Sequence, residues 1–161
     1  EDVEAGRLVL SPFDAGNLCD EWLELGIVRW LQVRSVSPNG PKNIWSVQQP
    51  GVPVAGMPTL PDDADPVTGR GIQYPFTEPA PGEWHSPWDR EKLEPTKEVV
   101  RKVLAYHKAD PQKRLKYITT EMINLPDYGH NAKYSLIGQN AAIAQFVRDT
   151  WEDIDRAGSD A

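Results

Sequence analysis

Three polar side chains stand beside or within apolar runs of the sequence, where they are candidates for metal binding and proton transfer. Glu121 follows the run LKYITT, Asp14 follows RLVLSPF, and Gln32 lies inside IVRWLQVRSV. An isolated ionised carboxylate within a sheet is costly, so Glu121 requires a cation or a metal as its partner. Carboxylate and amide oxygens are ligands of hard divalent ions, and the three residues therefore form a candidate site for Mg²⁺ or Mn²⁺. The alternative is an ordinary ion pair between Glu121 and Arg34.

An alternating α/β pattern would bring such residues together. Apolar runs with β-branched and aromatic members predict strands, and the second of them shows no alternation, as in a parallel strand covered on both faces. Strand, strand, helix, strand, helix is the resulting order, and parallel strands joined by helical crossovers carry functional groups at their carboxyl ends. The predicted strands are 7–13, 27–36 and 115–123, and the predicted helices are 91–108 and 135–154.

The two predicted helices each have one apolar face. Asp89 and Thr96 are alternative N-caps for the first helix, and Asp110-Pro111 ends it. Apolar residues at helical spacing predict the buried face of each helix. The first face comprises Val99, Val100, Val103, Leu104 and His107, and the second comprises Ile137, Ala141, Ala144, Phe146, Val147 and Trp151.

A long excursion, residues 37–90, interrupts this pattern. It holds eleven of the fifteen prolines and three of the six tryptophans, so it cannot be regular helix or central strand. Flexible linkers are rarely so aromatic, and we expect the aromatic residues to anchor an ordered loop. The alternative is a plain disordered loop. The expected anchors are Trp45, Tyr74, Phe76, Trp84 and Trp88.

Composition excludes several classes of protein. A chain of 161 residues suits one domain, and a formal charge of −7 with no Lys/Arg block argues against nucleic acid as a partner. No apolar run approaches the roughly 20 residues of a membrane span, and the acidic first residues are unlike a signal peptide. Cys19 is the only cysteine, which suits a reducing compartment, and we expect a cytoplasmic protein without a membrane partner.

Three pieces of the sequence carry a resemblance to a known family. The segment YITTEMINLPDYGHNAKYSLIGQNAAIAQFVRDTW (117–151), the stretch DAGN (14–17) and the strand VRWLQVRSV (28–36) occur in the same order in the C-terminal portion of another fold. Together they resemble the end of a xylose-isomerase-like (β/α)8 TIM barrel of the sugar isomerase and epimerase superfamily. The resemblance implies an α/β chain that is the C-terminal part of such a barrel, with the Pro/Trp-rich loop as an excursion.

The resemblance also implies roles for individual residues. Glu121 would match the last metal-binding glutamate and Asp14 the metal-binding aspartate. Asn17 would occupy a position often held by a substrate-binding histidine. Gln32 falls where the family has its metal-binding histidine, which is a departure, because an amide is a poorer ligand than an imidazole. Arg34 would contact sugar hydroxyls or phosphate.

Five further residues are candidates for acid–base catalysis on a carbohydrate or for carbohydrate binding. His130 lies on the loop after Glu121 and is a candidate acid or base, or else a solvated loop histidine. Tyr128 would line the mouth of the same site. His85 stands between Trp84 and Trp88, and this aromatic cluster would either stack on a sugar ring or pack the excursion against the barrel or a partner.

The chain differs from the family mainly in its length. A full barrel needs about 250 residues and eight strands, whereas this chain has three predicted strands. We therefore predict that residues 1–161 form one incomplete barrel domain that a second protein chain completes, because buried parallel strands with open edges are not stable in water. The predicted activity is metal-dependent isomerisation or epimerisation of a sugar by proton transfer next to a carbonyl. The alternatives are a related glycoside-cleaving lyase subunit and a non-catalytic scaffold subunit.

Overall fold

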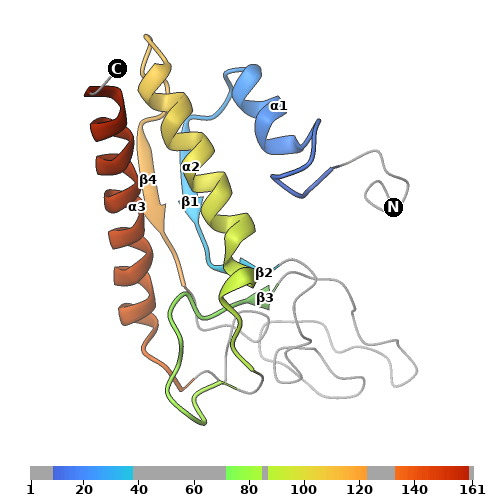
Figure 1. Ribbon diagram of the computed structural model, residues 1–161, viewed down its shortest axis with the longest axis vertical. Helices are drawn as coiled ribbons and strands as arrows, with labels where there is room; N and C mark the ends of the chain where they lie inside the picture. Colours follow the sequence, from blue (N-terminus) through green and yellow to red (C-terminus); the bar gives the residue numbers. More distant parts are fainter. Residues whose placement is uncertain (1–8, 38–71, 85–86, 123–132, 160–161) are drawn as a thin grey trace, which may run out of the picture. The chain divides into compact units, whose positions relative to one another are not determined.

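The computed structural model describes residues 9–37, 72–84, 87–122 and 133–159 (Figure 1). The described residues divide into two compact units, one within the ranges 1–33, 94–121 and 142–161 and one within 34–93 and 122–141. No helix within the described ranges is both long enough and apolar enough to cross a membrane. The elements are α1 (Leu18–Glu24), β1 (Trp30–Val33), β2 (Val36–Ser37), β3 (Ile72–Gln73), the 3-10 helix η1 (Arg90–Leu93), α2 (Glu94–Ala109), β4 (Tyr117–Thr120) and α3 (Leu136–Ser159).

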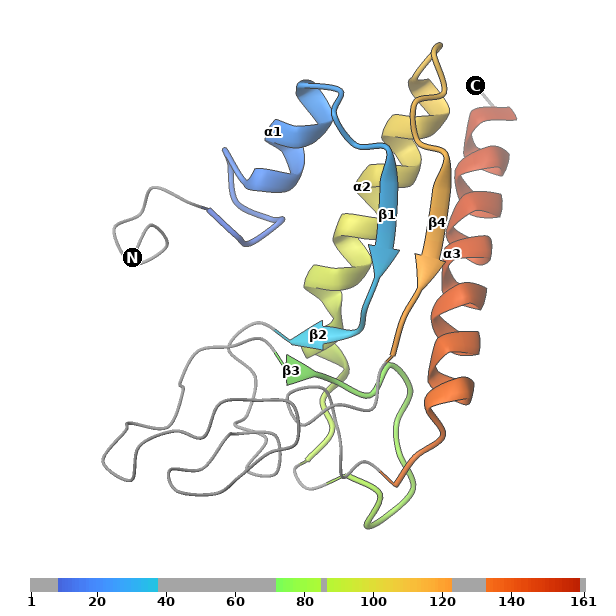
Figure 2. The ribbon, with the colours of Figure 1, turned by 180° about the vertical axis from the view of Figure 1, so that it is seen from behind.

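A parallel strand pair organises the first unit. β1 pairs with β4 in the register Trp30 to Tyr117 through Val33 to Thr120. The backbone N–H of Glu121 donates to the carbonyl of Val33 at 3.0 Å, which continues the ladder past the end of β4. Figures 1 and 2 show the two strands side by side, with α2 on one face of the pair. The predicted parallel strands are confirmed for this pair, while the remaining strands of a barrel stay a prediction.

The core of the first unit lies between the strand pair and the helices. Leu23 of α1, Val103 of α2 and Leu115 before β4 are buried together, with Leu31 and Ile118 packed against them. Only alternate residues of β1 turn toward this core, and Trp30 remains 60% exposed. The prediction that the second strand is covered on both faces stays a prediction, because the described residues bury only the side chains that face the core.

The start of α2 is preceded by one of the two N-caps that the sequence predicts. The Asp89 carboxylate accepts a hydrogen bond from the backbone N–H of Glu91 at 2.9 Å, so Asp89 caps the 3-10 turn that leads into the helix. Thr96, the alternative cap, lies inside α2. Val100, Val103 and Leu104 are buried, which confirms the predicted face.

The buried face of α3 differs from the predicted one. Ile137 is 85% exposed, whereas Gln139, Ile143 and Thr150 are buried. Apolar spacing misidentified the face because two of these buried residues are polar and satisfy their hydrogen bonds within the fold: Thr150 Oγ1, for example, donates to the carbonyl of Phe146 at 2.8 Å. The helix also extends to Ser159, beyond its predicted end at residue 154.

The predicted first strand, 7–13, is absent from residues 9–13. Val9 makes an isolated bridge to Asn17, and turns follow it. Pro12 has no N–H to donate to a ladder, and the N–H of Asp14 donates to the Ser11 carbonyl at 3.2 Å, which closes a turn. The predicted strand 27–36 is likewise divided, since β1 ends at Val33 and β2 pairs antiparallel with β3.

The end of the excursion is ordered around aromatic residues in the second unit. Tyr74 and Phe76 are buried, and the Tyr74 hydroxyl accepts from the N–H of Asp89 at 2.8 Å. The Trp88 indole N–H donates to the Pro75 carbonyl at 3.0 Å. These contacts confirm the anchoring role of the aromatic residues in 72–84 and 87–93, while Trp45 lies outside the described residues.

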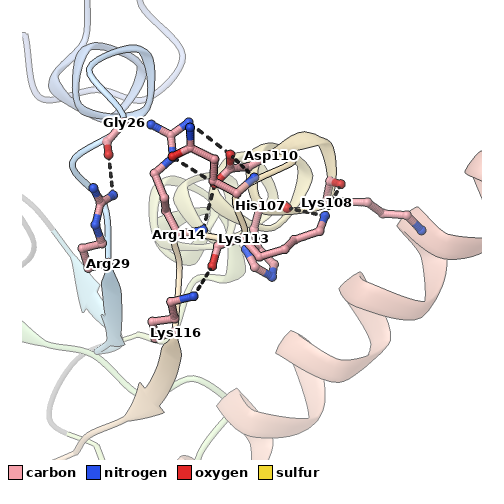
Figure 3. A network of polar contacts seen from close by, with 9 residues as sticks. Gly26, Arg29, His107, Lys108, Asp110, Lys113, Arg114 and Lys116 are labelled. Carbon is pink, nitrogen blue, oxygen red and sulfur yellow. Dashed lines mark hydrogen bonds and ion pairs between the residues drawn. The ribbon is translucent and has the colours of Figure 1, made fainter.

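Asp110 holds the turn between α2 and β4. Its carboxylate accepts from the backbone N–H of Arg114 at 2.8 Å and from the Arg114 guanidinium at 3.1 Å (Figure 3). It also accepts from the backbone N–H of Gln112 at 3.1 Å. Asp110 is only 3% exposed. The side-chain hydrogen bonds from Arg114, followed by the bond from its backbone, hold the pKa of Asp110 well below its usual range.

We predict that Asp110→Asn lowers Tm at pH 7 by about 5 °C and that the difference shrinks as the solution is acidified. A carboxyl whose pKa is depressed by folding stabilises the protein above its unfolded pKa of about 3.9, and this contribution is lost as pH falls toward the folded pKa. Thermal unfolding followed by circular dichroism at several pH values measures the difference. Asp153→Asn is the matched control, because Asp153 also pairs with a nearby arginine but is exposed. A difference that does not change with pH would contradict the ionic role.

Candidate functional site

The candidate site lies on the uncovered face of the strand pair. Side chains alternate along a strand, so Trp30 and Gln32 of β1 share a face with Tyr117 and Thr119 of β4, and Glu121 continues that face by one more step. We call these five residues the open face. The Trp30 indole N–H donates to Thr119 Oγ1 at 2.9 Å and joins the two strands across it.

Glu121 stands at the carboxyl end of the pair. Its backbone is fixed by the bond to the Val33 carbonyl, and its side chain is half-buried. Gln32 is exposed and lies opposite Thr119, two residues before Glu121. The strand register thus brings a carboxylate and an amide to the same face and the same end of the sheet, which the sequence predicted for Glu121 and Gln32.

Asp14 and Asn17 belong to the loop before α1. Asp14 is exposed, and Asn17 is fully buried at the N-cap of the helix. The Asn17 amide oxygen accepts from the N–H of Asp20 at 3.0 Å, and its NH₂ group donates at 2.7 Å to the Asp14 carbonyl and to the Asp20 carboxylate. Both polar atoms of the Asn17 side chain form hydrogen bonds at the helix N-terminus. Asn17 is therefore not one of the proposed substrate contacts.

Asp20 is held by a cation from α2. The Lys102 ammonium lies 2.8 Å from the Asp20 carboxylate, and hydrogen bonds from Lys102 and then Asn17 lower the pKa of Asp20. The neighbouring Cys19 is half-buried, and burial, with the charge of Asp20, raises the pKa of its thiol. These groups stabilise the α1 end of the unit and do not form a reactive thiolate.

The described residues contain no group of three or more His, Cys, Asp or Glu side chains placed to hold a metal ion. Glu121 and Gln32 supply two oxygen ligands, whereas Mg²⁺ takes six, several of which are usually waters. The described residues of the open face therefore do not form a complete protein-built metal centre.

Three expected site residues belong to the second unit. Arg34 follows β1 and is half-buried. Trp84 packs edge-on against Tyr74, with ring centroids 5.7 Å apart, and also against the buried Tyr134 at 5.9 Å. Trp88 is the residue bonded to Pro75. The two tryptophans thus contact residues of the second unit, while sugar stacking and packing against the barrel or a partner both stay predictions. His85, Tyr128 and His130 lie outside the described residues.

Aromatic residues of the open face were missed by sequence reasoning. Trp30 and Tyr117 are 60% and 68% exposed, and both belong to strands. Flat exposed aromatic faces beside polar groups are typical of carbohydrate sites. The period-2 spacing of Trp30 and Gln32, and of Tyr117, Thr119 and Glu121, indicates that each set shares one face of its strand. The sequence does not give the pairing register, which is needed to show that the two sets lie on the same face of the sheet.

Comparison with known proteins does not place this chain in a family. No family model, no curated protein and no solved structure matches it.

Proposed function

We propose that this chain is the C-terminal part of a (β/α)8 barrel and that it works in a cytoplasmic, sugar isomerase or epimerase-like enzyme. The observation that carries the proposal is the placement of Glu121 at the carboxyl end of a parallel strand pair, on the face opposite α2. That face is the interior in a closed barrel, and catalytic groups in barrels lie at the carboxyl ends of strands.

The proposed chemistry is proton transfer beside a carbonyl. The Glu121 carboxylate removes the proton from the carbon next to the sugar carbonyl, and the electron pair of that C–H bond forms the C=C bond of an enediolate, whose negative charge lies on the former carbonyl oxygen. In isomerisation, Glu121 returns its proton to the former carbonyl carbon, while the proton of the neighbouring hydroxyl passes to the enediolate oxygen. In epimerisation, a second acid delivers a proton to the opposite face of the original carbon. Trp30 and Tyr117 would flank the sugar on the open face. His130 remains the candidate for a second acid or base.

A divalent metal remains part of the proposal for the assembled enzyme only. Glu121 and Gln32 would contribute oxygens, Asp14 is the further expected ligand, and the second chain would complete the set. The described residues alone do not complete the coordination of such an ion.

Exposed apolar surface supports a second chain. Beside the edge of β1 that has no partner strand among the described residues lies a groove of about 630 Å³, lined by Leu18, Trp22 and Ile27 among other apolar residues. Trp22 and Ile27 are about half exposed. Large apolar patches of this kind mark interaction surfaces, and parallel strands are normally covered on both faces. A second chain that supplies the remaining strands would cover both the open face and this groove.

A non-catalytic scaffold subunit is the second candidate function. It is favoured by Gln32, which stands where the family resemblance implies histidine, and by the incomplete ligand set of the described residues. In that case the open face would keep the barrel geometry, while the reaction would take place on residues of another subunit.

The purified complex tests the proposal. A tagged copy of this chain, isolated from the cells that produce it, is expected to carry a second, different chain by native mass spectrometry and stoichiometric Mn or Mg by elemental analysis. A complex that neither retains nor rebinds a metal would favour the scaffold function. A well-folded monomer would contradict the barrel completed by a second chain.

A further inference from the structure

The outer edge of β4, which faces away from β1, is unpaired among the described residues. Within the described ranges, the sheet consists of β1 and β4. Because the N–H of Glu121 points to Val33, the alternation of a parallel ladder turns the N–H and C=O groups of Ile118 and Thr120 toward the outer edge. Unpaired strand edges bind other strands through these groups.

A cavity of about 380 Å³ borders this edge. Its apolar part is formed by Leu104 of α2, Leu115 before β4 and Val147 of α3. His107 and Trp151, whose rings lie 5.9 Å apart, form an aromatic wall. In both ribbon views α3 runs along the outer side of β4 (Figures 1 and 2). The cavity therefore has room for a large apolar side chain from a strand beside β4.

The charge at the cavity is opposite to that of the whole chain. Lys116 and Arg148 line it together with a single acidic residue, Glu152, although the chain has a formal charge of −7. The Lys116 ammonium donates to the Lys113 carbonyl at 2.8 Å, and neither cation forms an ion pair within the described ranges. Carboxylates of an incoming segment would be attracted to these two cations.

We propose that the outer edge of β4 binds a β-strand of the second chain. The strand bonds to the backbone of Ile118 and Thr120, inserts a large apolar side chain between His107 and Val147, and places Asp or Glu beside Lys116 and Arg148. This inference rests on the proposed function, because the strand belongs to the chain that completes the barrel.

Hydrogen exchange tests the edge directly. The complex purified through the tagged chain is compared with the same chain expressed alone, and the amides of Ile118 and Thr120 are expected to exchange at least about tenfold more slowly in the complex. Thr120→Pro removes an N–H from the outer edge and leaves the bonds to β1 in place, so it is expected to weaken binding of the second chain at least about tenfold.

Charge reversal provides a second, independent variant if Thr120→Pro disturbs the fold. Arg148→Glu is expected to weaken the complex by about fivefold or more, and the effect should diminish at high salt. Arg90→Glu is the matched control, because Arg90 is an exposed cation that does not line the cavity.

The possible outcomes separate this inference from the proposed function. A complex that forms normally with both variants, or that leaves the two amides unprotected, overturns the inference and leaves the proposed function standing. Protection by a second copy of this chain also overturns it. A tagged chain that purifies without any second chain overturns the inference and, with it, the two-chain barrel.

Discussion

Replacing Glu121 by glutamine is expected to lower the rate of proton exchange on the sugar substrate by at least about 100-fold. Glutamine keeps the size and much of the hydrogen bonding of the side chain but cannot accept a proton from carbon. The backbone bond from residue 121 to Val33 is unaffected by the change, so the end of the strand pair is retained. The measurement is deuterium incorporation beside the carbonyl of a panel of aldoses and ketoses in D₂O, followed by NMR with the purified complex.

Glu24→Gln is the matched control. Glu24 is an exposed glutamate at the end of α1 and is not part of the open face, so its variant should exchange protons at the wild-type rate. Native mass spectrometry must show the second chain bound equally to both variants. An intact Glu121→Gln complex with the wild-type rate would remove Glu121 from the chemistry. A wild-type complex that exchanges no proton with any sugar of the panel would favour the scaffold function.

Local patterns predicted the elements around the site well. β-branched and aromatic runs located β1 and β4, and the helical spacing of Val100, Val103 and Leu104 identified the buried face of α2. The Asp89 cap was also foreseeable, because a carboxylate directly before a helix start satisfies a free backbone N–H. These features depend on residues that are close in the sequence, so sequence patterns predict them directly.

Features that depend on distant neighbours were not predictable from the same patterns. Ile137 has the right spacing for the buried face of α3 and is nevertheless exposed, since the helix turns Gln139 inward to meet backbone amides more than 60 residues away. The open face was hidden for a similar reason. An apolar run without alternation resembles a fully covered strand, and only the register of β1 on β4 shows which side chains share the uncovered side.

Gln139 gives the second large prediction. Its Oε1 accepts from the backbone N–H groups of Phe76 at 2.6 Å and Thr77 at 3.0 Å, and its Nε2 donates to Thr77 Oγ1 at 3.0 Å. The residue is 5% exposed. One buried side chain therefore fixes the end of the excursion, next to the buried Tyr74, through both of its polar atoms.

Gln139→Leu is expected to lower the free energy of unfolding by about 2 kcal/mol, because leucine fills similar space but leaves the buried N–H of Phe76 without this acceptor, at about 1–3 kcal/mol for a buried group. Thr77 is exposed, so water can replace the acceptor of its N–H. Urea unfolding measures the loss, and hydrogen exchange should show faster exchange at Phe76 and Thr77. Gln145→Leu is the control in the same helix: Gln145 is exposed and donates only to Asp149, so its variant should change stability by less than about 0.5 kcal/mol. Equal losses for the two variants would mean that the bonds of Gln139 do not hold the excursion, and that the aromatic packing of Tyr74 and Trp84 orders it without them.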